Sequence, residues 1–452
     1  MKQRFVAASL VSGLLSATTS CSDARPVSLV SADAGSSLCA TSRATTEAII
    51  VVPSVVTMRR RGLHAKVRPG SGLTCQWSMI NGEITSGTHG TEISFTAGEP
   101  GTATIACDAA DGSGRQEREI EVRPYGLELI AGQPSVSGHR DGLHALFHEP
   151  RAADVDADGI IYVPEPMNRD VRKVWPDGCT ETIAGAPGVL GAEDGPALQA
   201  RFSKPVGVAL DGEGNLFIID ERNATLRVLT REGVVRTLVG RAEEVGSQDG
   251  DGTVARLRIP TGVYFVSPGM LLVGDYGNNV IRRVAYTSDW TARVETVAGD
   301  ASDPNPRAQD GEGAAIRFWG PHDVTPDGQG GFLVADNGAR SVRRLTFNGQ
   351  LPRVTTLGTR GAFHWPRDVA LDPQGRVLVA ESGSGVVSLI SPDQSVSVLV
   401  GARDDKRLVL GNLASARMSG PTSITMDALG DFVLVDAGAH VVLRLRYNTD
   451  EP

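Results

Sequence analysis

The chain has little cysteine, few aromatic residues and an excess of negative over positive charge. Five cysteines in 452 residues are too few for a scaffold built on disulfides, and neither a CxxC pair nor a histidine-rich spacing predicts a zinc site. Lysine and arginine number 44 against 53 aspartate and glutamate residues, which gives a net charge of −9. The one basic cluster is residues 59–61. Nucleic acid and anionic membrane surfaces are therefore not expected as partners.

Long hydrophobic runs are also missing, apart from one at the N-terminus. Two basic residues precede an apolar run over residues 5–17, which is too short to span a bilayer. Residues 1–21 are therefore predicted to be a secretory signal. Its end resembles a bacterial lipoprotein signal, in which Cys21 becomes lipidated, although Thr18 stands where leucine is usual. The alternative is ordinary signal cleavage without an anchor.

This start predicts an exported protein at the outer membrane, the cell surface or in the periplasm. A lipid on Cys21 would be its one link to a membrane. Residues 22–46 are mostly Ser, Ala, Asp and Thr, which predicts a flexible tether that holds the folded part away from the surface.

Residues 47–123 contain short alternating apolar runs separated by turn residues, which predicts a small β-sandwich. The stretch CQWSMINGEITSGTHGTEISFTAGEPGTATIAC resembles the Ig-like or PKD-like modules of bacterial exported proteins. Cys75 and Trp77 lie on one face of a strand and Cys107 lies on a later strand. Because an oxidising compartment lets cysteines pair, a bridge between Cys75 and Cys107 is expected. The close spacing of Cys75 and Trp77 indicates that this bridge does not join opposed sheets.

A fixed fragment recurs six times in the second part of the chain. It consists of an apolar residue, two residues, a proline, eight residues, a glycine, five residues and a carboxylate. Successive prolines are 55, 55, 61, 45 and 55 residues apart, a period typical of a propeller or a solenoid. The six prolines are Pro150, Pro205, Pro260, Pro321, Pro366 and Pro421. The six carboxylates are those of Glu165, Asp220, Asp275, Asp336, Glu381 and Asp436.

Each repeat contains four strand-like runs, and the second run is continuously apolar, which indicates a sheet that is covered on both faces. A fourth-strand signature closes five repeats but is missing after Pro421. Its missing copy is at residues 129–132, so an N-terminal strand is predicted to complete the last blade. The repeat PVGVALDGEGNLFIIDERNATLRVLTREGVVRTLVG resembles the NHL repeat. This resemblance implies an all-β fold with a six-bladed NHL-type propeller over residues 124–448.

The six carboxylates can be interpreted as catalytic or metal-binding groups, or as structural groups. Because the group is repeated in every blade, we interpret it as bonding to backbone amides at a tight turn. The Asp-Gly pairs at 141, 194, 249 and 310 are interpreted in the same way. With Asp251 and Glu312 nearby they also suggest calcium, although the ligand spacing of a calcium loop is absent. No cofactor is predicted.

Differences between the repeats are concentrated in the fourth and fifth blades. Aromatic, histidine, arginine and aspartate side chains lie close to the prolines there, and the short loop over residues 358–366 leaves a gap in the rim. We interpret this group as a candidate ligand pocket. The interpretation that the sequence favours over a pocket is that the two tryptophans fill the space left by the short loop. The candidate residues are Trp319, His322, Asp323, His364, Trp365, Arg367 and Asp368.

A catalytic function has weaker support. His322 in GPHDV resembles one metal-ligand position of the amidating lyases, which need three such histidines. In the other five blades the positions that correspond to His322 are Arg151, Val206, Thr261, Arg367 and Thr422. None is a histidine, so the sequence does not support this metal site. No nucleophile motif is present either. We expect a non-enzymatic exported binding or scaffold protein that recognises a protein or surface ligand through the loop face of the propeller. The alternatives are a hydrolase or lyase with a pocket near blades four and five, and a purely structural envelope component.

Overall fold

The computed structural model describes residues 50–53, 55–68, 71–303 and 307–448. The predicted signal (1–21), the tether (22–46) and Cys21 lie outside these residues. The regular secondary structure of the described residues consists of β-strands and two short 3-10 turns, η1 (Tyr276–Asn278) and η2 (Gly313–Ala315). This confirms the expected all-β class. Within the described ranges, no helix is long and apolar enough to cross a membrane.

The N-terminal part is a sandwich of two sheets, with strand orders β1-β3-β7-β5 and β2-β9-β8-β4-β6. In β3 buried and exposed residues alternate, as expected for a strand with one face on a core. Trp77 and Phe95 lie in that core. The strands are β1 (Ile50–Val51), β2 (Val55–Thr57), β3 (Leu63–Val67), β4 (Cys75–Ile80), β5 (Gly82–Ile84), β6 (His89–Gly90), β7 (Glu92–Ala97), β8 (Gly101–Ala109) and β9 (Arg115–Arg123).

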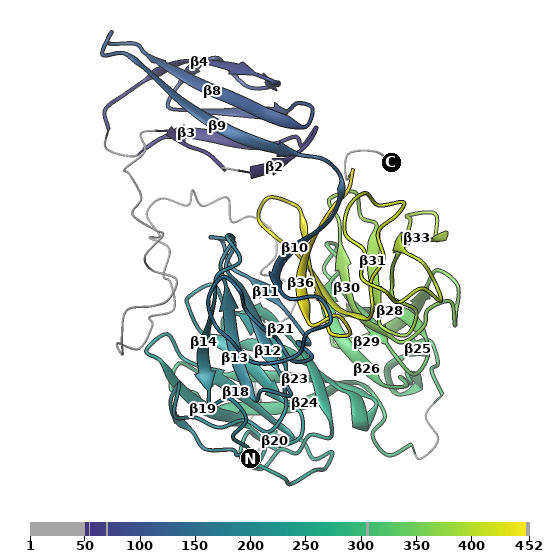
Figure 1. The fold of residues 1–452 in the computed structure, drawn as a ribbon. Helices are drawn as coiled ribbons and strands as arrows, with labels where there is room; N and C mark the ends of the chain where they lie inside the picture. The colour runs from purple at the N-terminus through teal and green to yellow at the C-terminus, as the bar shows by residue number, and fades with distance from the viewer. Residues whose placement is uncertain (1–49, 54, 69–70, 304–306, 449–452) are drawn as a thin grey trace, which may run out of the picture.

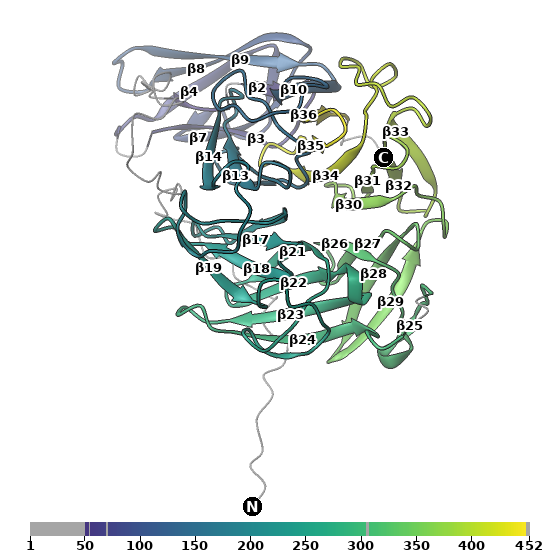
Figure 2. The same cartoon turned by 60° about the horizontal axis from the view of Figure 1, so that its bottom comes forward.

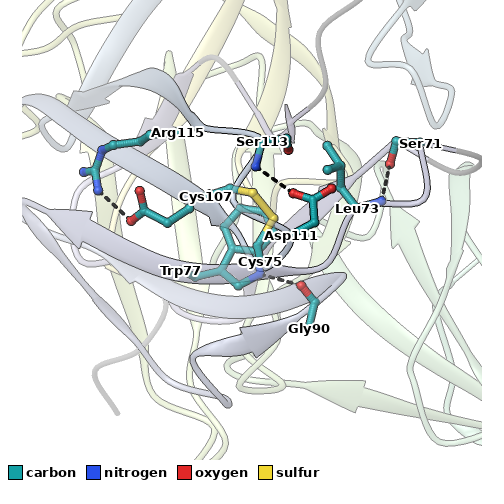
Figure 3. The surroundings of a disulfide bond; sticks show 10 residues. Ser71, Leu73, Cys75, Trp77, Gly90, Cys107, Asp111, Ser113 and Arg115 are labelled. Atoms are coloured by element: carbon teal, nitrogen blue, oxygen red, sulfur yellow. Dashed lines mark hydrogen bonds and ion pairs between the residues drawn. A yellow bond between two sulfur atoms is a disulfide. The ribbon is translucent and has the colours of Figure 1, made fainter.

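Cys75 and Cys107 are joined by a disulfide between β4 and β8, which are neighbours in one sheet (Figure 3). Trp77 pairs with Cys107 in the strand register, so the bridge runs diagonally across the pair of strands. The indole Nε1 of Trp77 donates a hydrogen bond to the carbonyl oxygen of Gly90 at 3.0 Å. The bridge therefore links strands of the same sheet, as the sequence indicates.

The second part of the chain forms six antiparallel sheets of four or five strands within the described residues, here called blades one to six. Their strands, blade by blade, are β11 (Asp154–Val155), β12 (Ile161–Glu165), β13 (Asp170–Val174) and β14 (Thr180–Gly185); β15 (Gly195–Pro196), β16 (Pro205–Leu210), β17 (Leu216–Asp220), β18 (Thr225–Leu229) and β19 (Val234–Val239); β20 (Gly250–Asp251), β21 (Pro260–Ser267), β22 (Met270–Asp275), β23 (Val280–Tyr286) and β24 (Ala292–Gly299); β25 (Gly311–Glu312), β26 (Pro321–Pro326), β27 (Phe332–Asp336), β28 (Ser341–Asn348) and β29 (Leu351–Leu357); β30 (Pro366–Leu371), β31 (Val377–Glu381), β32 (Val386–Ile390) and β33 (Val396–Gly401); β34 (Pro421–Met426), β35 (Phe432–Asp436) and β36 (Val441–Arg446), with β10 (Gly126–Gly132).

The blades form a closed ring (Figure 2). The innermost strands β11, β16, β21, β26, β30 and β34 each contact the next, and β34 also contacts β11. Strand β10 enters from the sandwich and pairs antiparallel with β36, with Gly126 opposite Arg446 (Figure 1). The N-terminal strand thus completes blade six, as predicted. Strands β12, β17 and β35 are buried along their whole length, because apolar clusters fill the space between neighbouring blades.

The repeated carboxylates bind backbone amides at the entrance to each blade. In blade two, Asp220 accepts hydrogen bonds from the backbone N–H groups of Ser203 at 3.1 Å and Lys204 at 2.7 Å. The amide of Asn223 also donates to it, at 2.7 Å. Corresponding main-chain bonds reach the carboxylates of the other five blades. The turn-bonding interpretation therefore describes all six, and each carboxylate holds the loop that precedes an innermost strand.

A buried arginine follows this carboxylate by seven residues in blades one to four. In blade two, Arg227 connects Asp194 of the Asp-Gly pair, at 2.5 Å, with Asp220, at 3.8 Å. The other three are Arg172, Arg282 and Arg343. These arginines neutralise the aspartates of the Asp-Gly pairs, for which the sequence also suggests calcium binding. Blade five departs from the pattern, because Arg403 approaches Glu381 from a loop instead.

Candidate functional site

A cavity of about 290 Å³ occupies the centre of the ring and is lined by innermost-strand residues of all six blades. A second cavity of about 200 Å³ adjoins it and is also lined by Lys204, Glu221, Ile259 and Tyr276. These four residues precede a first strand or follow a second strand, so the second cavity lies on the proline side of the ring. We call it the channel mouth, and the carboxylate-bearing part of the larger cavity the channel floor. The two cavities share Arg151, Val206, Thr261, His322, Arg367 and Thr422.

Three basic side chains from three blades converge on the channel mouth. Lys204 pairs with Glu221 at 2.8 Å, and Arg151 pairs with Glu149 at 3.1 Å. Arg367 donates from Nε to Ser382 Oγ at 3.2 Å and from a terminal nitrogen to His322 at 2.9 Å. Among the described residues no carboxylate pairs with Arg367, and the buried Nε of Arg151 has no hydrogen-bond partner. The mouth therefore carries more positive than negative charge.

His322 is held in one neutral tautomer by its surroundings. Because a guanidinium only donates, Nε2 of His322 accepts the bond from Arg367, and the ring proton is on Nδ1. Burial lowers the pKa of His322 well below its usual range, and the charges of Arg367 and Arg151 lower it further. The ring of Tyr276 meets the imidazole edge to face, with 6.2 Å between centroids. His322 thus adds no charge to the mouth.

Three aspartates from blades one, four and five form the channel floor. Asp154 accepts from the backbone N–H of Leu210 at 2.8 Å, and Asp368 accepts from that of Ile424 at 2.9 Å, so each ties its blade to the next. Burial raises the pKa of Asp154 to about 6. Asp323 and Asp368 hydrogen-bond to each other, and burial raises the pKa of both. Two carboxyl groups in contact share one proton, so this pair both donates and accepts hydrogen bonds.

The structure brings four of the seven sequence-predicted residues together in the channel. These four are His322, Asp323, Arg367 and Asp368. The other three, Trp319, His364 and Trp365, lie on the exposed rim outside both cavities.

The cavity therefore lies at the ring centre and not at the gap left by the short loop of blade five. Trp319 is 50% exposed and Trp365 is 59% exposed, so filling of that gap by buried tryptophans is also not observed. Trp365 has a left-handed backbone, with φ of 53°, and its carbonyl oxygen accepts bonds from Ser382.

Four residues of the site were not among the sequence candidates. Arg151, Lys204 and Tyr276 come from blades one to three, and the sequence comparison between repeats emphasised blades four and five. Asp154 lies four residues after its proline, whereas Asp323 and Asp368 lie two after theirs. Comparing all six repeats for charged side chains around each proline would have found Arg151 and Lys204. Asp154 has no such signal.

Within the part of the chain that the structure describes, no three His, Cys, Asp or Glu side chains are grouped so that they could hold a metal ion. The polar groups of the channel instead form a basic layer above a layer of partly protonated carboxyls. This arrangement suits hydrogen bonding to a small molecule.

Comparison with known proteins supports the fold. No family model matches the chain. A curated relative, the chloroplast protein SUPPRESSOR OF QUENCHING 1 of Arabidopsis thaliana, is 29% identical over 129 residues, which is 26% of this chain and 12% of that protein. A protein of unknown function from Bacteroides thetaiotaomicron has a similar structure, with a TM-score of 0.56, 14% identity and coverage of 88% of this chain and 98% of that one. An auxiliary nutrient binding protein from the same organism gives a TM-score of 0.51, 12% identity and coverage of 89% and 98%. The chain therefore shares the propeller-containing fold of these structures.

Proposed function

We propose that the chain is a non-enzymatic exported binding protein that takes a small anionic ligand at the channel mouth. The observation that carries this proposal is the convergence of Arg151, Lys204 and Arg367 on one cavity, where Arg367 has no carboxylate partner among the described residues. A partly buried charge without a counter-charge is costly. An anion that binds a guanidinium through charged hydrogen bonds offsets this cost.

The proposed architecture serves presentation of this site. Residues 1–21 export the chain, a lipid on Cys21 anchors it, and the tether together with an Ig-like spacer holds an NHL-type propeller away from the membrane. The rim around the mouth also exposes Trp319 and Trp365, which are side chains suited to a protein contact. One protein of similar fold is an auxiliary nutrient binding protein, and a binding role is compatible with that description.

A hydrolase or lyase has less support from the geometry. The Nε2 atom of His322 is already bonded to Arg367, so it is not free to take a proton from a substrate. Asp368 is bonded to Asp323 and to two backbone amides. These polar groups stabilise the ring and are available for recognition, but none is paired with a nucleophile.

A thermal-shift screen of the full chain tests the proposed binding function. Small organic anions and inorganic phosphate are compared with neutral molecules of similar size. At least one anion should raise the melting temperature of the wild type and of Trp365→Ala, whose side chain lies outside the cavities, but not that of Arg367→Gln. Mass spectrometry should recover the anion unchanged. A stabilisation that persists in Arg367→Gln, or conversion of the anion, would contradict the proposal.

A further inference from the structure

The channel mouth and the channel floor present opposite charge to a ligand. Arg151, Lys204 and Arg367 surround the mouth, whereas the floor bears three aspartates. An ion that is negative on every side, such as inorganic phosphate, is attracted to the mouth but meets carboxyl oxygens as it moves inward. The best match is a molecule with an anionic group at one end and polar groups without negative charge at the other end.

The floor favours hydroxyl groups at that second end. The Asp323–Asp368 pair both donates and accepts because it holds a shared proton. The hydroxyls of Thr325 and Thr425 line the same cavity and have the same dual capacity. An ammonium group only donates, so it would leave donors of this wall without an acceptor, whereas an alcohol satisfies both kinds of group.

The dimensions of the channel limit the ligand to a compact molecule. The two cavities, of about 290 and 200 Å³, overlap through six shared residues, and each is smaller than the roughly 300 Å³ at which the range for small-molecule sites begins. The ring of Tyr276 supplies an apolar surface at the entrance. A single polyhydroxylated ring with one carboxylate fits this space and these polar groups.

We propose that the channel binds an acidic monosaccharide, with its carboxylate held by Arg367 and Arg151 and its ring hydroxyls at the Asp323–Asp368 pair. This inference rests on the proposed function, since it names the ligand class of the same site. Arg367 uses Nε for Ser382 and one terminal nitrogen for His322, and its other terminal nitrogen forms no hydrogen bond to any described residue. That nitrogen can donate to a carboxylate, and Arg151, which lines both cavities, adds a second positive charge beside it.

Isothermal titration calorimetry on the full chain tests the ligand class. The probes are D-glucuronate and D-galacturonate, which differ in one hydroxyl orientation, with D-glucose, acetate and inorganic phosphate as comparisons. At least one uronate should bind tenfold or more tightly than glucose, acetate and phosphate. Arg367→Gln and, as a second variant, Arg151→Gln should each weaken uronate binding at least tenfold. Trp365→Ala is the matched rim control and should leave it unchanged, and circular dichroism verifies that each variant is folded.

The possible results separate the ligand class from the binding function. Uronate binding no tighter than that of acetate or glucose overturns the acidic-sugar assignment. If acetate or phosphate then binds in a manner that requires Arg367, the channel remains an anion site and the assignment alone fails. If no probe binds in a manner that requires Arg367, both proposals fail.

Discussion

Removal of one buried arginine should reveal how much each blade depends on its internal ion pairs. Arg282 in blade three is fully buried and connects Asp275, at 2.9 Å, with Asp249. In an Arg282→Met variant, Asp275 keeps its bonds from Arg258 and Asn278 but loses its counter-charge. Breaking a buried pair from one side costs about 3–5 kcal/mol. Asp249 is 46% exposed, so water can solvate it after the arginine is removed, and its lost pairing adds little to the destabilisation.

The cost should depend on pH in a direction that the structure fixes. Burial raises the pKa of Asp275, and Arg282 lowers it. Without Arg282 the folded-state pKa rises further above the unfolded value, so protonation restores stability as pH falls and the deficit grows as pH rises. The loss in unfolding free energy, measured by urea denaturation with circular dichroism, should be larger at about pH 7.5 than at about pH 5.

Blade five offers the matched control for this experiment. Arg403 is 34% exposed, and Glu381 retains bonds from Ser384, Ser388 and the backbone N–H of His364. Arg403→Met should therefore destabilise the chain by at most half as much as Arg282→Met. Equal losses for the two variants, or a loss for Arg282→Met that does not change with pH, would refute the reasoning.

Three further predictions concern the sandwich, its contact with blade six and the channel. The double variant Cys75→Ser and Cys107→Ser should lower sandwich stability by about 3–4 kcal/mol in chemical denaturation without reducing agent, because the bridge closes a separation of 32 residues; a loss below about 1 kcal/mol would contradict this. Asp431→Ala, which removes one partner of Arg60, at 2.9 Å, and the acceptor of Thr57, should speed proteolysis between the two parts of the chain; unchanged cleavage would mean that other contacts hold them together. Gly262→Ala should weaken uronate binding in calorimetry, because the added carbon would lie 2.3 Å from a carboxyl oxygen of Asp323 in the channel floor; an unchanged uronate affinity would show that Asp323 does not contribute to the ligand site.

Most of the fold was predictable because it depends on local patterns that repeat. The spacing of proline and carboxylate marks where a first strand starts and a second strand ends, and Asp220 shows the reason, since it bonds the backbone just before Pro205. The fourth-strand signature at residues 129–132 predicted the pairing of β10 with β36. Contact between Thr57, Arg60 and Asp431 was not predictable, because no sequence pattern relates residues so far apart.

The candidate site was predictable only in part. His322, Asp323, Arg367 and Asp368 were identified because they differ from the small residues at the same places in other repeats. Their meeting point is set by the closure of the ring, which directs the first strand of every blade toward one axis. Trp365 and Arg367 are two residues apart in the sequence, but Trp365 lies on the rim and Arg367 lines the channel, because the chain passes from the rim into the channel at Pro366.

The seam of the ring has a consequence for the order of assembly. Strand β36 lies between β10 and β35, so the sheet of blade six joins the first and the last strands of the propeller. A chain that emerges N-terminus first can form blades one to five as each is completed, but β10 has no partner until β36 appears. Its unpaired edge is then open to other strands. Removal of residues 441–446 should therefore produce aggregation and not a stable five-bladed remnant.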